Sequence, residues 1–64
     1  MINMIKQTHI FNDWEDDHMD RLKNSINLLE IQGFQFKETI MDDNLSFLYE
    51  KGNEQHLLSI VYEK

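Results

Sequence analysis

The chain has 64 residues, with 12 Asp and Glu against 6 Lys and Arg, no Cys, no Pro and two Gly. This length allows one small domain with a thin hydrophobic core, and we expect residues 1–64 to form a single domain. The missing Cys excludes disulfides, thiolate metal sites and a Cys nucleophile, and the net charge of −6 argues against nonspecific binding to nucleic acid or to an anionic membrane.

The first apolar segment of the sequence is too interrupted for a secretory signal or a membrane span, because Asn3 and Lys6 break it. Its apolar residues are Ile2, Met4, Ile5, Ile10 and Phe11. We expect this segment to be a strand that lies beside the C-terminal strand and covers that edge of the sheet. The sequence also predicts a cytoplasmic protein without membrane contact, which fits the absence of Cys.

A helix is predicted from near Asp13 to Gly33. Asp13 suits the N-cap position, and the acidic residues that follow it suit the positive end of the helix dipole. Gly33 suits the helix end, since glycine adopts the left-handed conformation without a Cβ clash. The spacing of the apolar residues predicts one buried stripe, formed by Met19, Leu22, Ile26 and Leu29 with Trp14 and Leu28 near its flanks.

After Gly33 the apolar pattern alternates, which is typical of half-buried strands. A two-residue loop at Gly52-Asn53 would pair Phe47 with Leu58, and a loop at Asp43-Asn44 would place Ile40 opposite Phe47. Both hairpins would then carry their large apolar residues on one face. The sequence therefore predicts an α+β fold in which one helix packs on a three- or four-stranded antiparallel sheet, in the order β-α-β-β-β.

The same register places Leu48, Leu57 and Val61 on the opposite face of the sheet. Neighbouring apolar residues on a sheet face indicate burial against something. We interpret the three as a self-association or partner face and expect a homodimer. The alternative is that the N-terminal segment folds over them within one chain.

An acidic cluster at the predicted helix start consists of Asp13, Glu15, Asp16, Asp17 and Asp20. A calcium loop of the EF-hand type fails, because His18 and Asn24 stand where it needs Gly and Glu. The remaining interpretations are mimicry of a DNA phosphate array, a patch that docks on a basic partner, and a solvated helix start that the dipole favours.

Catalysis and metal binding have little support in the sequence. His9, His18 and His56 lie far apart, so we expect structural or surface histidines and no metal or cofactor. No serine has a placed base, and Ser46 and Ser59 are predicted to be cross-strand neighbours. Glu38 would lie opposite Tyr49, near the rim of the core. We expect a protein that is not an enzyme.

Three stretches of the chain carry a family resemblance: the strand from Ile5 to Phe11, the helical segment 20–27 and the strand entry at Gly33-Phe34-Gln35-Phe36. With the closing segment 58–63, they resemble very small β-α-β-β domains from Firmicutes and their phages, including a sporulation-associated family. The resemblance covers most of the chain and implies the fold, but it assigns no functional residue.

From these features we expect a non-catalytic interaction protein, borne by a phage or prophage, that binds and inhibits a host protein. The acidic cluster would steer it to a basic surface, such as the nucleic-acid site of a host or defence enzyme, without binding nucleic acid itself. Two alternatives stay open: a protein that sequesters a small ligand in a pocket between protomers, and a structural component of a spore or virion.

Overall fold

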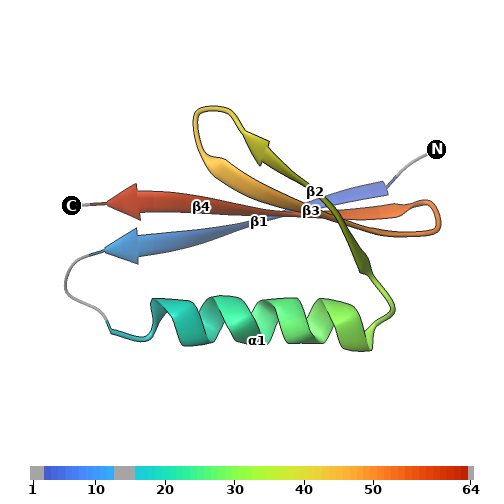
Figure 1. Ribbon diagram of the computed structural model, residues 1–64, viewed down its shortest axis with the longest axis horizontal. Coiled ribbons are helices and arrows are strands. Elements are labelled where there is room, and N and C mark those ends of the chain that lie inside the picture. The colour runs from blue at the N-terminus through green and yellow to red at the C-terminus, as the bar shows by residue number, and fades with distance from the viewer. Residues whose placement is uncertain (1–2, 13–15, 64) are drawn as a thin grey trace.

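A four-stranded sheet and one helix form the structure, a computed structural model that describes residues 3–12 and 16–63. In chain order the elements are β1 (Asn3–Asn12), α1 (His18–Ile31), β2 (Gln35–Met41), β3 (Leu45–Lys51) and β4 (Glu54–Glu63). The strands lie in the spatial order β1-β4-β3-β2, and α1 runs along one face of the sheet (Figure 1). The predicted α+β class and the order β-α-β-β-β are confirmed.

The sheet is mixed, so the prediction of a purely antiparallel sheet is wrong. β1 lies beside β4, as expected, but it pairs with β4 in parallel, from Asn3 opposite Glu54 to Asn12 opposite Glu63. The direction follows from the single helix between β1 and β2. Because α1 carries the chain back along the sheet, β2 starts at the end where β1 started (Figure 1). Two hairpins then make β4 run the same way as β2, and so the same way as β1.

The β3–β4 hairpin has the predicted register. Phe47 lies opposite Leu58, Tyr49 opposite His56 and Lys51 opposite Glu54. Gly52 has a φ of +59°, and no described non-glycine residue has a positive φ. A positive φ at the first turn residue alone fits the type II′ turn, whose twist matches that of the two strands.

The β2–β3 hairpin differs from the prediction by one residue. Its loop has three residues, 42–44, so Thr39 lies opposite Phe47 and Ile40 opposite Ser46. A bulge between Phe36 and Glu38 then restores Phe36 to the face of Tyr49. The predicted pairings of Ile40 with Phe47 and of Glu38 with Tyr49 are therefore wrong, because an odd loop reverses which face each residue occupies.

The helix starts later than predicted. α1 begins at His18 with Asp17 as N-cap, while the predicted cap, Asp13, lies outside the described residues. Its end agrees with the prediction: Gly33 has a φ of +97°. The Phe34 N–H then bonds to the Leu29 carbonyl at 2.9 Å, which satisfies a carbonyl of the last turn.

The core lies between α1 and the sheet and is small. Its buried residues are Leu22, Leu29, Phe34, Tyr49 and Leu58, with Phe11, Ile26, Phe47 and Ile60 packed partly buried against them. Met19, predicted in the buried stripe, is 55 % exposed, and His18 takes the inner position at this end of the helix. The buried stripe of α1 therefore includes His18 in place of Met19. Within the described part of the chain, no helix combines the length and apolarity needed to cross a membrane.

Candidate functional site

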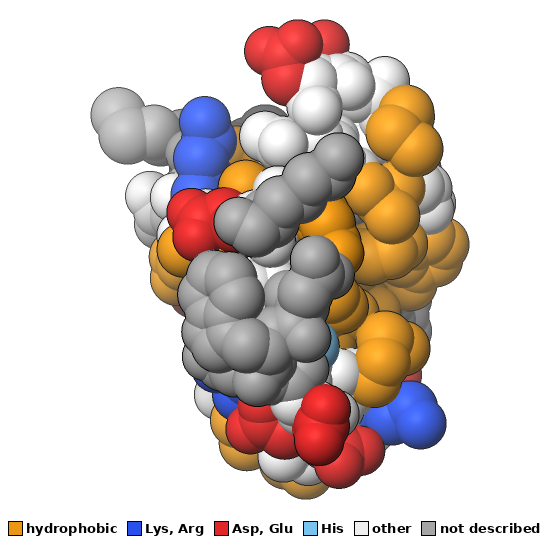
Figure 2. All heavy atoms as spheres, turned by 90° about the vertical axis from the view of Figure 1, so that its left-hand side faces the viewer, with side chains coloured by type: hydrophobic (Ala, Val, Ile, Leu, Met, Phe, Trp, Pro, Cys, Tyr) orange, Lys and Arg blue, Asp and Glu red, His pale blue; other side chains and the backbone are white. Residues whose placement is uncertain are grey.

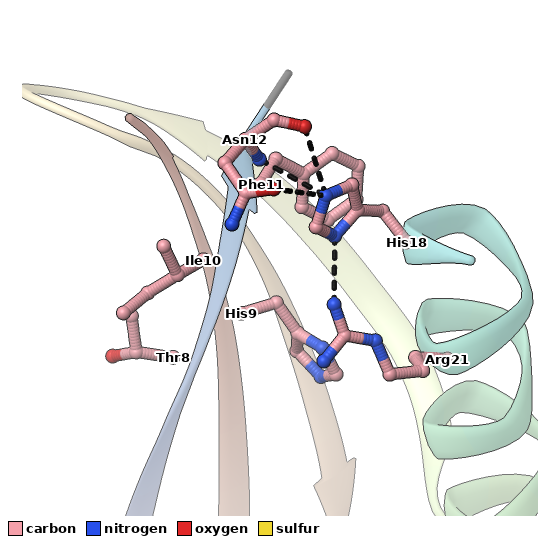
Figure 3. A pocket seen from close by; sticks show the side chains of 7 residues that line it. All are labelled: Thr8, His9, Ile10, Phe11, Asn12, His18 and Arg21. Atoms are coloured by element: carbon pink, nitrogen blue, oxygen red, sulfur yellow. Dashed lines mark hydrogen bonds between the residues drawn. The ribbon is translucent and has the colours of Figure 1, made fainter. Parts of the chain in front are cut away.

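A cluster of polar side chains joins the start of α1 to the end of β1 (Figure 3). His18 is buried, and its ring stacks on Phe11 with the centroids 4.7 Å apart and the planes at 16°. Nε2 of His18 lies 3.0 Å from both the main-chain N and the carbonyl O of Asn12. On the other side of the ring, Arg21 approaches Nδ1 of His18 at 2.8 Å. Nε2 of His18 thus ties the helix start to the strand end, while Nδ1 contacts a residue of the same helix.

A second polar chain lies between the sheet and the middle of α1. Nε2 of His56 lies 2.9 Å from Oε1 of Gln7, so the imidazole donates to the amide oxygen. The Gln7 amide nitrogen donates in turn to Ser25 Oγ at 3.2 Å and lies 3.1 Å from Nε2 of His9. All three elements that meet here, β1, β4 and α1, therefore contribute a side chain to one hydrogen-bonded chain.

The environment favours the neutral form of two of these histidines. Burial lowers the pKa of His9, and the positive charge of Arg21 lowers it further. Burial also lowers the pKa of His56. A neutral ring suits the chain, since Nε2 of His9 can then accept a hydrogen bond from Gln7. In the structure these histidines take part in the hydrogen bonds between β1, β4 and α1.

A pocket of about 380 Å³ opens beside this cluster. It is lined by Thr8, His9, Ile10, Phe11, Asn12, His18 and Arg21. Its polar groups are engaged with one another, since Arg21 contacts both His18 and the Asp17 carboxylate, the latter at 3.5 Å. Among the described residues, no group of three or more His, Asp or Glu side chains is arranged to hold a metal ion.

The predicted acidic cluster is described in part. Asp16, Asp17 and Asp20 are exposed at the start of α1, while Asp13 and Glu15 lie outside the described residues. Asp17 is also paired with Arg21 four residues later. The three acids thus form an exposed negative group, of which one member already has a cationic neighbour.

The three apolar residues predicted as a contact face lie on the sheet face away from α1, which we call the outer face. Leu48 and Leu57 are register partners there, as expected, but Leu48 is only 6 % exposed within one chain. Leu57 and Val61 are half-buried. Further apolar side chains of this face come from both edges of the sheet: Met4 (47 % exposed), Ile10 (48 %) and Ile40 (37 %). Only the parallel pairing of β1 and the register of β2 bring these three to the outer face.

A second apolar surface, not predicted from the sequence, lies on the helix side of the sheet near β2. We call it the β2 strip; it consists of Phe36 and Met41, with the half-buried Leu45 and Phe47 beside them. Phe36 is 54 % and Met41 74 % exposed, because α1 approaches the sheet most closely at β1, the opposite edge. The ring of Phe36 packs edge to face on Tyr49, with the ring centroids 5.6 Å apart.

Acidic side chains follow the β2 strip at its Met41 end, and further acids lie at the helix start. Asp42 and Asp43 are exposed in the loop that follows Met41, and Asp16, Asp17 and Asp20 lie at the helix start, at the same end of the molecule. In Figure 2, which shows this end, hydrophobic side chains gather along one side, with red carboxylates above and below them. The alternation of apolar residues after Gly33 is the sequence signal for this strip. The strip can be assigned to a sheet face only when the register of β2, with Ile40 opposite Ser46, is known.

Comparison with known proteins finds no match: no family model, curated protein or solved structure matches this chain. The resemblance to small β-α-β-β domains of Firmicutes and their phages therefore stays a prediction.

Proposed function

We propose that this protein is a non-catalytic binding module that docks a protein partner on the β2 strip. The observation that carries the proposal is the exposure of Phe36 and Met41, on a strand edge that α1 leaves uncovered. An apolar patch with a polar rim on a small domain is typical of a protein-binding surface. The packing of Phe36 on Tyr49 supports this role, because an aromatic ring that already rests on a neighbour loses less conformational entropy on binding.

The charge around the β2 strip supports a basic partner. Asp42 and Asp43 directly follow Met41 in the loop after β2, and the whole chain has a net charge of −6. Exposed carboxylates at the rim of an interface mainly raise the rate of association with a positively charged surface. A nucleic-acid-binding protein of a host cell has such a surface, and blocking it is the inhibitory role that the sequence led us to expect.

Binding of a purified tagged chain to proteins of a bacterial extract tests the proposal. The change Met41→Asp places a charge in the middle of the β2 strip, and we expect at least a tenfold loss of the captured partner. Ile31→Asp is the matched control, since Ile31 is 80 % exposed on α1 and takes no part in the strip. Equal capture by both variants would refute the role of the β2 strip.

The electrostatic part is tested separately. Reversing Asp42 and Asp43 to Lys should lower the association rate and weaken its dependence on salt, with little change in the dissociation rate. If the extract yields no protein partner and denaturation of the chain releases a small molecule instead, ligand sequestration replaces the binding module as the function.

A further inference from the structure

The outer edge of β1 presents main-chain groups that the sheet does not use. The Asn3 N–H donates to the Asn53 carbonyl at 3.1 Å, so the odd-numbered residues of β1 direct their main-chain groups toward β4. The even-numbered residues direct theirs away from the sheet: Met4, Lys6, Thr8, Ile10 and Asn12. At Asn12 the His18 ring lies against these groups, which leaves the stretch from Met4 to Ile10 as an edge for pairing.

The two edges of the sheet differ in how they are protected. β2 has seven residues, a bulge and the adjacent charges of Lys37 and Glu38, all of which hinder pairing with another strand. β1 has ten residues in uninterrupted register, and Lys6 is its one charged side chain among the residues described. A long, regular edge strand of this kind pairs with another strand unless something covers it.

Exposed apolar side chains flank the β1 edge on both faces. Met4 and Ile10 lie on the outer face at 47 % and 48 % exposure, and Ile5 lies on the helix side at 59 %. The pocket also borders this edge, since Thr8 and Ile10 point to one side of β1 and His9 and Phe11 to the other (Figure 3). A strand laid along β1 would therefore find hydrogen-bonding groups, apolar neighbours and space.

We propose that this strand is β1 of a second copy, paired antiparallel about a two-fold axis at Gln7. The pairing joins the two sheets into one continuous sheet with the helices on the same side. Because facing residues must share a face, the axis can pass through a residue but not between two residues. An axis at Gln7 places Met4 opposite Ile10 of the second copy, and Lys6 opposite Thr8 of the second copy.

Neighbouring registers are poorer. Shifting the axis to Lys6 would set the two lysines directly opposite each other, which is destabilising. Shifting it to Thr8 would set Lys6 opposite Ile10 and leave Met4 beyond the paired stretch. With the axis at Gln7, the apolar Met4 faces the apolar Ile10 of the other copy, and the cationic Lys6 faces the hydroxyl of Thr8. Chemical matching therefore selects one register.

Single-cysteine variants test the register directly, since the natural chain has no Cys. In the proposed pairing Lys6 and Thr8 of different copies have Cα atoms about 5.5 Å apart, within disulfide range. Two copies of Lys6, or two of Thr8, are roughly 9 Å apart, outside that range. An oxidised mixture of Lys6→Cys and Thr8→Cys should give mainly the mixed dimer, at least tenfold faster than either variant alone. Self-linked dimers formed equally fast would refute the register.

A proline variant tests whether the edge itself is used. Thr8→Pro removes an N–H that points away from β4, so the monomer keeps its hydrogen bonds between β1 and β4. The proposed pairing loses one hydrogen bond, and the proline ring obstructs the approach of the second copy. Thr8→Ala is the matched control. By light scattering we expect the natural chain and Thr8→Ala at twice the mass of one chain, and Thr8→Pro at the mass of one, with unchanged circular dichroism. A monomeric natural chain at 0.1 to 1 mM, which is roughly the range where weak pairs form, would overturn the proposal.

The dimer is independent of the proposed function, because the β2 strip lies at the far edge of each copy. Thr8→Pro should leave partner capture by the β2 strip intact apart from avidity, and Met41→Asp should leave the dimer intact. A different protein that pairs with β1 would appear as a complex of unequal subunits, which also contradicts self-pairing.

Discussion

The Arg21 guanidinium donates to Nδ1 of His18 at 2.8 Å and thereby fixes the tautomer of the buried ring. Arginine has only donors, so Nδ1 must be the acceptor and the ring proton must sit on Nε2. With the proton on Nε2 the ring donates to the Asn12 carbonyl at 3.0 Å, whereas the Asn12 N–H, at the same distance, donates to Nε2 only in the other tautomer. The contact between two residues of the first helical turn thus decides how the helix attaches to β1.

Replacement of His18 should destabilise the domain without affecting its binding surfaces. His18→Ala removes the stacking on Phe11 and leaves the Asn12 carbonyl without its donor, which we expect to lower the free energy of unfolding by about 2–3 kcal/mol. His18→Phe keeps a ring on Phe11 and should lose only about 1–2 kcal/mol. Urea denaturation measures both.

Met19→Ala is the neighbouring control for this prediction. Met19 is 55 % exposed, so its truncation should change the free energy of unfolding by less than about 0.5 kcal/mol. If the Met19 variant lost as much as the His18 variant, the predicted stripe through Met19 would be closer to the truth than the observed one.

Stability should fall on mild acidification. The pKa values of His9 and His56 are lowered in the folded chain by burial, and at His9 also by Arg21. Below their ordinary pKa of 6.5 the unfolded chain therefore binds protons that the folded chain does not, and the free energy of unfolding decreases as the pH falls. Urea midpoints measured between about pH 7.5 and 5.5 check this.

The double variant His9→Gln/His56→Gln should flatten that part of the pH profile. A separate loss is expected at lower pH, because hydrogen bonds from Gln55 and Lys37 lower the pKa of the Glu50 carboxyl below 4.5. Glu50 stabilises the folded state above that value and stops doing so when it is protonated. A natural chain whose midpoint stayed constant down to about pH 5.5 would contradict the role given to the two histidines.

The hydroxyls of Ser46 and Ser59 should be energetically coupled. Their Oγ atoms lie 3.0 Å apart on the outer face, and Ser46 is only 7 % exposed. Ser46→Ala leaves a partly buried hydroxyl without its partner and should cost about 1–2 kcal/mol, while the double change to Ala should cost little more. A double-mutant cycle with a coupling of about 1 kcal/mol is expected, and additive losses would show that water replaces the missing partner equally well.

Much of the fold could be predicted because its signals are local. Gly52-Asn53 sets the β3–β4 register down to Lys51 opposite Glu54, since a two-residue loop allows one pairing. Gly33 marks the helix end, and the alternation that follows it marks strands. In contrast, the loop 42–44 and the bulge near Lys37 have no comparably specific residue pattern, and one residue of error moved Ile40 to the wrong face.

Of the surfaces, the sequence by itself determined which residues are acidic, where the strands lie, and that Leu48 and Leu57 face each other. Only the tertiary structure decided that β1 runs parallel to β4, that α1 lies nearest to β1, and that Phe36 and Met41 stay exposed. The physical reason is the distance along the chain between the residues that interact. Turns and periodicity act between neighbouring residues, whereas the choice of a strand's partner, and of which edge one short helix covers, depends on contacts among segments far apart in the chain.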